Sequence, residues 1–203
     1  MRGLFISFEG IDGAGKTTQA RLLAEWLTGR GHVVTALREP GGTCVAERIR
    51  EILLYSKDEI DPRAELLLFL SSRAQNTAER IRPALAQGHI VICDRYADSS
   101  VAYQGHGRGL GADEVRALSM FASGGLAPDL TLLLDLSPEA GLARQKNSDR
   151  MEDEPLEFHR RVRHGYLSTA KDDPARVVIL DGAQDVEVLR DQIERVVQDR
   201  IGT

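Results

Sequence analysis

The clearest chemical pattern in the sequence is a glycine-rich stretch close to the N-terminus. The octapeptide Gly10-Ile11-Asp12-Gly13-Ala14-Gly15-Lys16-Thr17 fits G-x-x-x-x-G-K-[ST] and lies between an apolar run and a segment with helical spacing. Glycines let backbone N–H groups converge on a phosphate chain, and the start of the following helix adds the positive end of its dipole. Lys16 would add a cation, and Thr17 a hydroxyl ligand for Mg²⁺. The stretch predicts a phosphate-binding loop; a plain glycine-rich turn before a helix is the alternative.

A second pair of charged residues follows an apolar, β-branched run. Ile90-Val91-Ile92-Cys93 leads directly into Asp94-Arg95-Tyr96. In an open parallel sheet the carboxyl ends of the strands line the ligand crevice, and the first strand also ends there. Asp94 could hold a magnesium-bound water or an attacking phosphate oxygen, and Arg95 could neutralise phosphoryl charge. The alternative is an Asp–Arg pair that only caps a strand.

These residues need a scaffold, and the chain alternates short apolar runs with longer segments of helical spacing. The alternation is typical of an α/β fold, in which helices cover a parallel sheet. Strands are predicted at residues 4–8, 33–37, 90–93, 130–136 and 177–180, and helices at 16–28, 43–55, 64–87, 112–123, 156–171 and 185–200. No repeat or linker interrupts this pattern, so residues 1–203 are expected to form a single domain.

Composition and charge narrow the function classes. Of the 203 residues, 42% are hydrophobic and 28% are charged, and the net charge of -5 argues against a surface that tracks DNA or RNA. No run of about eighteen apolar residues occurs, and the N-terminus does not resemble a signal peptide, so no membrane association is expected. Of the two cysteines, Cys93 lies in an apolar run as a buried thiol would. A cytoplasmic protein is therefore expected.

Further motifs stand in the order found in bacterial thymidylate kinases, and the sequence resembles that family over nearly its whole length. Besides the glycine-rich loop, which continues to Thr18, they are Arg38-Glu39-Pro40-Gly41-Gly42-Thr43, Phe69-Leu70-Ser71-Ser72-Arg73, Asp94-Arg95-Tyr96 and Ala102-Tyr103-Gln104-Gly105. The resemblance implies a P-loop nucleoside monophosphate kinase, with a three-layer fold, a five-stranded parallel sheet and a short lid. It also implies transfer of the γ-phosphoryl group of ATP to dTMP in dTTP biosynthesis, with Mg²⁺ as cofactor, by a homodimer.

The same resemblance implies which residues recognise the base. Phe69 would stack on thymine, Arg73 would donate to an exocyclic oxygen, and Ser100 and Gln104 would complete the contacts. Stacking is worth about 1–3 kcal/mol per base, and a guanidinium offers fixed donors, so these roles are physically sound. By its pattern alone, Phe69 would be an ordinary core residue in an apolar run, and Arg73, one turn later, a surface charge.

Residues for the sugar and the phosphates are implied in the same way. Asp12 would approach the 3′-hydroxyl of the acceptor, and Tyr103 would pack near the deoxyribose and disfavour ribonucleotides. The arginines assigned to the acceptor phosphate and the transferring group are Arg38, Arg50 and Arg95. Arg48 competes with Arg50, because a helix over this segment can point only one of them inward.

The polar, doubly charged segment 144–155 ends at a proline and is expected to be a mobile lid, with a solvated loop as the alternative. Members of the family carry an extra catalytic arginine either in the phosphate loop or in the lid. Here the loop has no basic residue before Lys16, so Arg144 or Arg150 should supply that charge. Arg150 is preferred, because neighbouring acidic side chains could steer it.

Two other functions share parts of this pattern. A regulatory GTPase would have the phosphate loop but should also carry the guanine-reading string N-K-x-D, which does not occur. A P-loop kinase for a different nucleoside monophosphate or small metabolite remains the alternative. His106, in a glycine-rich stretch, is expected to be a turn residue without a chemical role.

Overall fold

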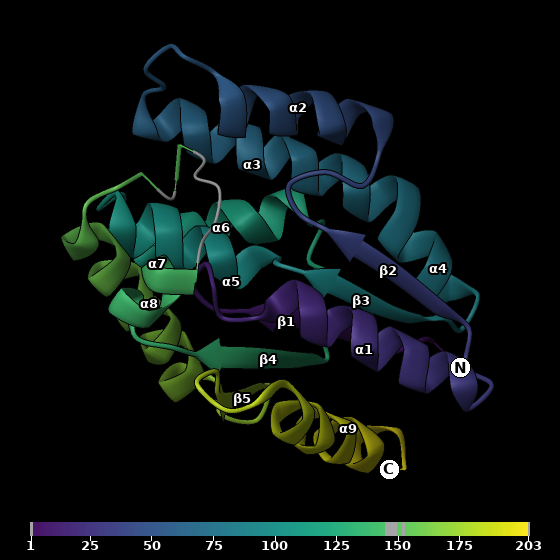
Figure 1. Cartoon of the computed structure of the whole chain (residues 1–203). Coiled ribbons are helices and arrows are strands. Elements are labelled where there is room, and N and C mark those ends of the chain that lie inside the picture. The colour runs from purple at the N-terminus through teal and green to yellow at the C-terminus, as the bar shows by residue number, and fades with distance from the viewer. Residues whose placement is uncertain (1, 145–149, 152, 203) are drawn as a thin grey trace.

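The computed structural model describes residues 2–144, 150–151 and 153–202. Within these residues, five parallel strands form one sheet in the order β2-β3-β1-β4-β5 (Figure 1). The strands are β1 (Phe5–Glu9), β2 (Val34–Arg38), β3 (Ile90–Asp94), β4 (Leu130–Asp135) and β5 (Val177–Asp181). All five predicted strands are confirmed, and so is the α/β fold class.

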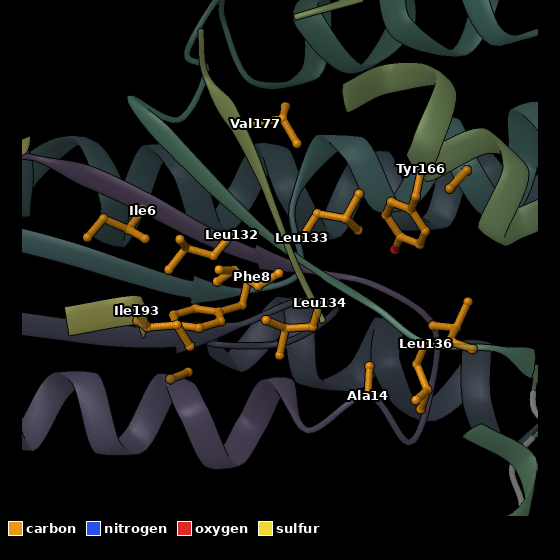
Figure 2. Close-up of a cluster of buried hydrophobic side chains, with 14 of the residues drawn as sticks. Ile6, Phe8, Ala14, Leu132, Leu133, Leu134, Leu136, Tyr166, Val177 and Ile193 are labelled. Carbon is orange, nitrogen blue, oxygen red and sulfur yellow. The ribbon is translucent and has the colours of Figure 1, made fainter. Parts of the chain in front are cut away.

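The central strands are buried along nearly their whole length, as strands covered by helices on both faces should be. Successive side chains alternate between the faces, so Phe5 packs in one apolar cluster and Ile6 in another. Figure 2 shows the larger cluster, in which Ile6 and Phe8 of β1 lie close to Leu132 of β4 and to Ile193. This alternation gives the two hydrophobic layers of a three-layer fold.

Helices cover both faces of the sheet. They are α1 (Lys16–Gly29), α2 (Cys44–Tyr55), α3 (Pro62–Asn76), α4 (Arg82–Ala86), α5 (Ala97–Ser100), α6 (Ala112–Ala122), α7 (Pro138–Arg144), α8 (Leu156–Asp172) and α9 (Val186–Ile201). Helices α1 and α9 pack together over the face that carries Ile6 and Phe8, whereas α4 and α5 lie on the face that carries Phe5. Helix α8 reaches this second face through Tyr166, whose hydroxyl donates to Glu9 of β1. Helices α2 and α3 pack against each other (Figure 1).

Several helical segments differ from the prediction. The expected helix over 64–87 begins at Pro62 and is interrupted by a π-helical turn, η1 (Thr77–Ile81), shortly before Pro83, which has no N–H to continue the regular ladder. A second π-helical segment, η2 (Val101–Gly107), extends α5 through the glycine-rich stretch. The interpretation of His106 as a turn residue was therefore wrong, since His106 lies within this helical segment. The i→i+5 hydrogen bonds of a π-helix do not produce the 3.6-residue period of an α-helix, so the sequence pattern did not indicate a helix here.

Burial of the cysteines agrees with the prediction. Cys93 is fully buried in β3, which raises the pKa of its thiol well above the usual value, whereas Cys44 is exposed. In the part of the chain that the structure describes, no helix has the length and apolarity needed to cross a membrane.

Candidate active site

A cavity of about 440 Å³ opens at the carboxyl edge of the sheet. The register pairs Phe8 with Asp94, and Arg38 with Asp94, so the ends of β1, β2 and β3 meet at this edge. From β1 the chain first builds the sheet on one side, with β2 and β3, and then crosses to the other side, with β4 and β5. Open α/β sheets bind ligands at such a change of direction. The lining residues are Asp12, Gly13, Gly15, Lys16, Thr17, Thr18, Arg38, Glu39, Pro40, Arg50, Leu54, Phe69, Asp94, Arg95, Ser99, Tyr103, Arg144 and Met151.

The glycine-rich loop wraps between β1 and the first turn of α1. Gly13 and Gly15 have φ values of 78° and 90°, which residues with a side chain rarely adopt. A Cβ atom on Gly13 would also collide with the backbone carbonyl of Gly141 in α7. Gly15 occupies the N-cap of α1 and has no side chain to bind the first N–H groups of the helix, so they remain directed toward the cavity.

Within the loop, the side chains divide between core and cavity. Ile11 and Ala14 are buried in the hydrophobic core, so only their backbone could meet a phosphate. Lys16 is only 6% exposed, and its Nζ donates to the carbonyl of Ile11 at 2.8 Å. Burial, followed by repulsion from Arg95, lowers the pKa of Lys16 to about 8. An anion at the cavity would favour the charged form of this lysine.

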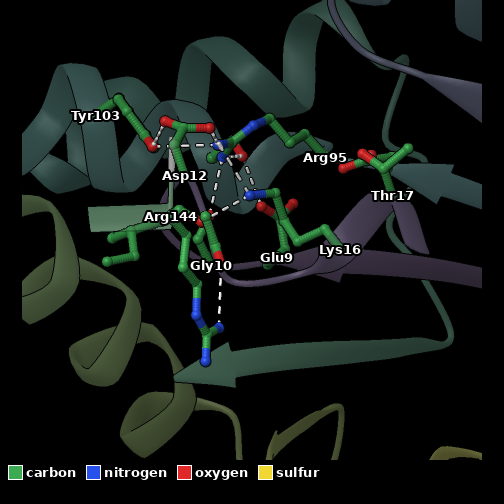
Figure 3. A network of polar contacts seen from close by, with 12 residues as sticks. Glu9, Gly10, Asp12, Lys16, Thr17, Arg95, Tyr103 and Arg144 are labelled. Atoms are coloured by element: carbon green, nitrogen blue, oxygen red, sulfur yellow. Dashed lines mark hydrogen bonds and ion pairs between the residues drawn. The ribbon is translucent and has the colours of Figure 1, made fainter. Parts of the chain in front are cut away.

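Arg95 is the centre of the polar network in Figure 3. Its Nη2 forms an ion pair with Asp12 and donates to the Tyr103 hydroxyl at 3.2 Å, and its Nη1 donates to the Gly10 carbonyl at 3.0 Å. Burial pushes the pKa of Asp12 upward, but the charges of Arg95 and Lys16 outweigh it and hold that pKa well below its usual value. The network therefore fixes a cation beside the glycine-rich loop.

Thr17 and Asp94 lie together on the other side of the loop. The Thr17 hydroxyl donates to Asp94 Oδ2 at 2.5 Å, and both residues line the cavity. A hydroxyl and a carboxylate are hard oxygen ligands of the kind that Mg²⁺ takes together with waters and phosphate oxygens. The pair therefore fits the predicted metal site in its chemistry. Among the described residues, no group of three or more acidic, histidine or cysteine side chains could hold a metal by itself.

Arg38 and Arg50 line the cavity from β2 and α2. Arg50 Nη1 donates to the Pro40 carbonyl at 2.9 Å, whereas Arg48 is exposed and does not reach the lining. Of the two competing arginines, Arg50 is thus the one that faces the cavity. Arg38 forms an ion pair with Glu47 at 3.0 Å, a partner that the sequence did not indicate.

The residues assigned to the base are not all on the cavity surface. Phe69 lines it, but Ser100 and Gln104 are buried and do not, while the neighbouring Ser99 does. Gln104 Nε2 donates at 2.9 Å to Glu65, which lies one turn before Phe69 on α3 and is fully buried. Base contacts by Ser100 and Gln104 stay predictions.

Arg73 is a buried ion-pair residue and not a surface charge. Only 2% of it is exposed, and it donates to Glu39 at 2.9 Å, to the Tyr96 carbonyl at 2.8 Å and to Ser119 at 3.3 Å. A guanidinium has five N–H groups, and these three bonds leave two for another acceptor. Its predicted hydrogen bond to the base would have to use one of those.

Because Glu39 is buried, Arg73→Ala should destabilise the fold as well as alter base binding. Removing one partner of a buried ion pair costs about 3–5 kcal/mol of unfolding free energy. Urea denaturation would measure this loss. Arg116→Ala, which breaks an exposed ion pair with Asp113, is the control and should cost under about 1 kcal/mol. Similar small losses in both variants would contradict the buried-pair account.

The two candidate lid arginines point to different partners. Arg144, the last residue of α7, lines the cavity and donates to the carbonyls of Gly13 at 3.2 Å and Gly182 at 2.9 Å. Arg150 instead donates to the Leu53 carbonyl at 2.9 Å and pairs with Glu65 at 2.7 Å. The geometry favours Arg144 beside the phosphate loop, the reverse of the preference drawn from the sequence. Lid residues 145–149 and 152 lie outside the described residues.

The sequence reasoning missed several polar residues of this region. They are Glu9, Glu65, Ser99, Arg108 and Tyr166, together with the apolar Met151, which lines the cavity. Glu65 accepts from Arg108 Nη2 at 3.0 Å as well as from Gln104 and Arg150, and these bonds outweigh burial and lower its pKa. A charged residue in an otherwise apolar helical stretch was the available signal for Glu65.

Comparison with known proteins gives one consistent result. A sequence model described as thymidylate kinase matches residues 8–193. Thymidylate kinases of Caldanaerobacter subterraneus subsp. tengcongensis and of Deinococcus radiodurans are each 49% identical to this chain, and the alignments cover 98% of it and 97% and 98% of those proteins. A crystal structure of thymidylate kinase from Ehrlichia chaffeensis superposes with a TM-score of 0.82 at 35% identity, covering 98% of this chain and 99% of that one. On its fold, its site geometry and these matches, the chain belongs to the thymidylate kinase family.

Proposed function

We propose that the chain, acting as a single domain, transfers the γ-phosphoryl group of ATP to dTMP and forms dTDP and ADP. The observation that carries the proposal is one cavity that is lined both by the glycine-rich loop and by the aromatic ring of Phe69. Lys16 and Arg95 lie beside the loop, and Phe69 lies on the wall formed by α3. Family membership supports the same reaction over a kinase for a different metabolite.

In the proposed reaction, a phosphate oxygen of dTMP attacks the γ-phosphorus in line and ADP leaves, so no covalent enzyme intermediate is needed. The transition state spreads negative charge over the phosphoryl oxygens. Lys16 and Arg95 are held in place before reaction and can face that charge, and Arg144 lies at the same loop. The chain's contribution is therefore position and charge.

Thr17 and Asp94 would hold Mg²⁺ in the loaded enzyme, partly through water. The ion would neutralise charge on the β- and γ-phosphates of ATP. The chain itself holds the Thr17 hydroxyl and the Asp94 carboxylate in mutual contact at the cavity.

Acceptor binding would use the part of the cavity wall that β2, α2 and α3 contribute. We assign Phe69 to stacking on the base, with Arg73, Ser100 and Gln104 behind it, and Arg38 and Arg50 to the acceptor phosphate. Asp12 would meet the 3′-hydroxyl, and Tyr103, whose hydroxyl donates to Asp12 at 2.6 Å, would lie beside the sugar.

Phe69→Ala should raise the KM for dTMP about tenfold or more with little change in the KM for ATP. The expectation follows from a stacking contribution of about 1–3 kcal/mol. Steady-state kinetics with each substrate varied in turn would measure it. Arg63→Ala, at an exposed position of α3, is the control. Equal losses for both substrates would place Phe69 in the core and not at the base.

The decisive test of function is an ADP-release assay with ATP, Mg²⁺ and a panel of nucleoside monophosphates. We expect the highest kcat/KM with dTMP, and lower values with dUMP, dCMP, dGMP, dAMP and the ribonucleotides. A higher kcat/KM for any other acceptor would favour the alternative, a P-loop kinase for a different substrate.

We further propose a cytoplasmic homodimer. Large apolar side chains on α6 and α3 support the dimer, because exposed apolar patches commonly mark interfaces. Phe121 is 87% exposed, and Leu118, Met120 and Leu67 are exposed as well. Light scattering should give twice the chain mass, and Phe121→Asp should lower it; a monomeric wild-type protein would contradict the proposal.

A further inference from the structure

Glu9 is a buried carboxylate that the proposed mechanism does not use. It is the last residue of β1 and directly precedes the phosphate loop, and none of it is exposed. Its Oε1 accepts the Tyr96 N–H at 2.7 Å. Its Oε2 accepts the hydroxyl of Ser99 at 2.6 Å and that of Tyr166 at 3.2 Å. All three donors adjoin Arg95 or contact it.

The two hydroxyls connect Glu9 to the guanidinium of Arg95. Arg95 Nη1 donates to Tyr166 at 3.0 Å and to Ser99 at 3.2 Å. A guanidinium only donates and an ionised carboxylate only accepts, so each hydroxyl must direct a lone pair at Arg95 and its proton away from it. The two hydroxyls also contact each other at 2.8 Å, and whichever donates within that pair, the chain of protons ends on Glu9.

Glu9 also holds the backbone at Arg95. This residue has φ of 71°, in the left-handed region that residues other than glycine seldom adopt, so its backbone is strained. The Arg95 N–H bonds to the Phe8 carbonyl at 2.9 Å, and the next N–H, that of Tyr96, bonds to Glu9. Both peptide groups around the strained residue are therefore bound to the end of β1.

We propose that Glu9 is a positioning residue for phosphoryl transfer, which fixes the backbone of Arg95 and, through the hydroxyls of Ser99 and Tyr166, the direction of its guanidinium. The inference rests on the proposed function, because Arg95 is the group that faces the transferring phosphoryl oxygens. Glu9 itself is buried and is not among the residues that line the cavity.

The surroundings of Glu9 make this role dependent on its ionisation. Burial, followed by the nearby charge of Asp98, raises the pKa of Glu9 to about 7, while Ser99, Arg95 and the Tyr96 N–H pull it down. Lys16 also feels the charge of Glu9, whereas Asp98 is itself paired with Arg176. When the pH is below that pKa, the protonated carboxyl becomes a donor. The hydroxyls of Ser99 and Tyr166 are then no longer both obliged to point their protons toward Glu9 and their lone pairs toward Arg95.

The test compares Glu9→Gln with Ser7→Ala. Ser7 lies on the same face of β1, is also fully buried, and loses a hydrogen bond to Thr131 that measures 2.8 Å, but it does not contact the Arg95 turn. Glu9→Gln should lower kcat about 10- to 100-fold, the scale of a small misplacement of a reacting group, and leave the KM for ATP nearly unchanged. Ser7→Ala should lower the melting temperature and keep kcat.

A pH profile gives a readout that a merely structural role would not move. The kcat of the wild-type chain should fall as the pH drops through about 7, where Glu9 takes up its proton. Glu9→Gln should lack this component, while any component from the titration of the substrates themselves remains in both proteins.

Failure of the inference can be told from failure of the proposed function. If the wild-type chain does not phosphorylate dTMP, the proposed function fails. If it does, and folded Glu9→Gln keeps wild-type kcat, or Ser7→Ala loses as much, the Glu9 inference alone fails. Should Glu9→Gln not fold, Ser99→Ala combined with Tyr166→Phe removes both hydroxyls and keeps the carboxylate; unchanged kcat in that variant would overturn the proposal.

Discussion

Lys16→Ala should lower kcat by roughly 10²–10³ while the fold remains intact, because one preorganised charge donor is lost from the phosphate site. The lysine is buried with its Nζ on the Ile11 carbonyl, and burial already disfavours its charge. Replacing this buried cation should therefore change the free energy of unfolding little. The lost hydrogen bond destabilises the fold, but the cost of burying the charge disappears as well. Single-turnover kinetics with saturating ATP and dTMP would measure the effect on the chemical step.

Circular dichroism and the melting temperature would show whether the variant is folded. Lys171→Ala, at the exposed end of α8, is the matched control and should keep wild-type kcat. Wild-type turnover in folded Lys16→Ala would remove the glycine-rich loop from its assignment as the phosphate site.

Arg144→Ala should lower kcat by roughly 10³, the scale seen when a transition-state arginine is removed in other phosphoryl transfers. Arg144 lines the cavity and reaches the Gly13 carbonyl of a loop that has no basic residue of its own before Lys16. An interaction made mainly in the transition state raises kcat without tightening substrate binding. The KM values for ATP and dTMP should therefore change little.

Arg150→Ala provides the contrast, because Arg150 is paired with buried Glu65 of α3, one turn before Phe69. Loss of the Arg150 side chain should displace its neighbour Met151, which lines the cavity, and so raise the KM for dTMP. The kcat should stay close to wild type. If Arg150→Ala lost kcat and Arg144→Ala did not, the original preference for Arg150 would be right. If neither variant nor the double variant lost kcat, the charge would have to come from Arg95 and Arg38.

The parts of the structure that depend on local sequence could be predicted. The five strands follow from short apolar runs, and the glycine-rich turn between β1 and α1 follows from the glycines before Lys16. The glycine-rich loop and Asp94 lie close together because parallel strands end at the same edge of the sheet. The family resemblance added Phe69, which periodicity alone would have left in the core.

Contacts between distant segments could not be predicted. Tyr166 and Glu9 are 157 positions apart, and their hydrogen bond depends on how α8 lies over the sheet. The burial of Lys16 and Arg73 likewise depends on what packs around them. The π-helical segments could not be predicted because their hydrophobic period differs from the 3.6 residues per turn of an α-helix.

The contact between Gly13 and Gly141 has a mechanical consequence. The backbone of the phosphate loop and that of α7 touch with no side chain between them, and a Cβ atom on either glycine would strike the other segment. Two main chains packed so closely cannot slide past each other without losing the fit, so a shift of one segment displaces the other. Filling the loop with a phosphate chain would thus be felt at α7, and through Arg144, its last residue, at the loop that follows β5. A ligand that holds α7 in one position would then change the affinity of the loop for a triphosphate. By linkage, the triphosphate would change the affinity for that ligand by the same factor.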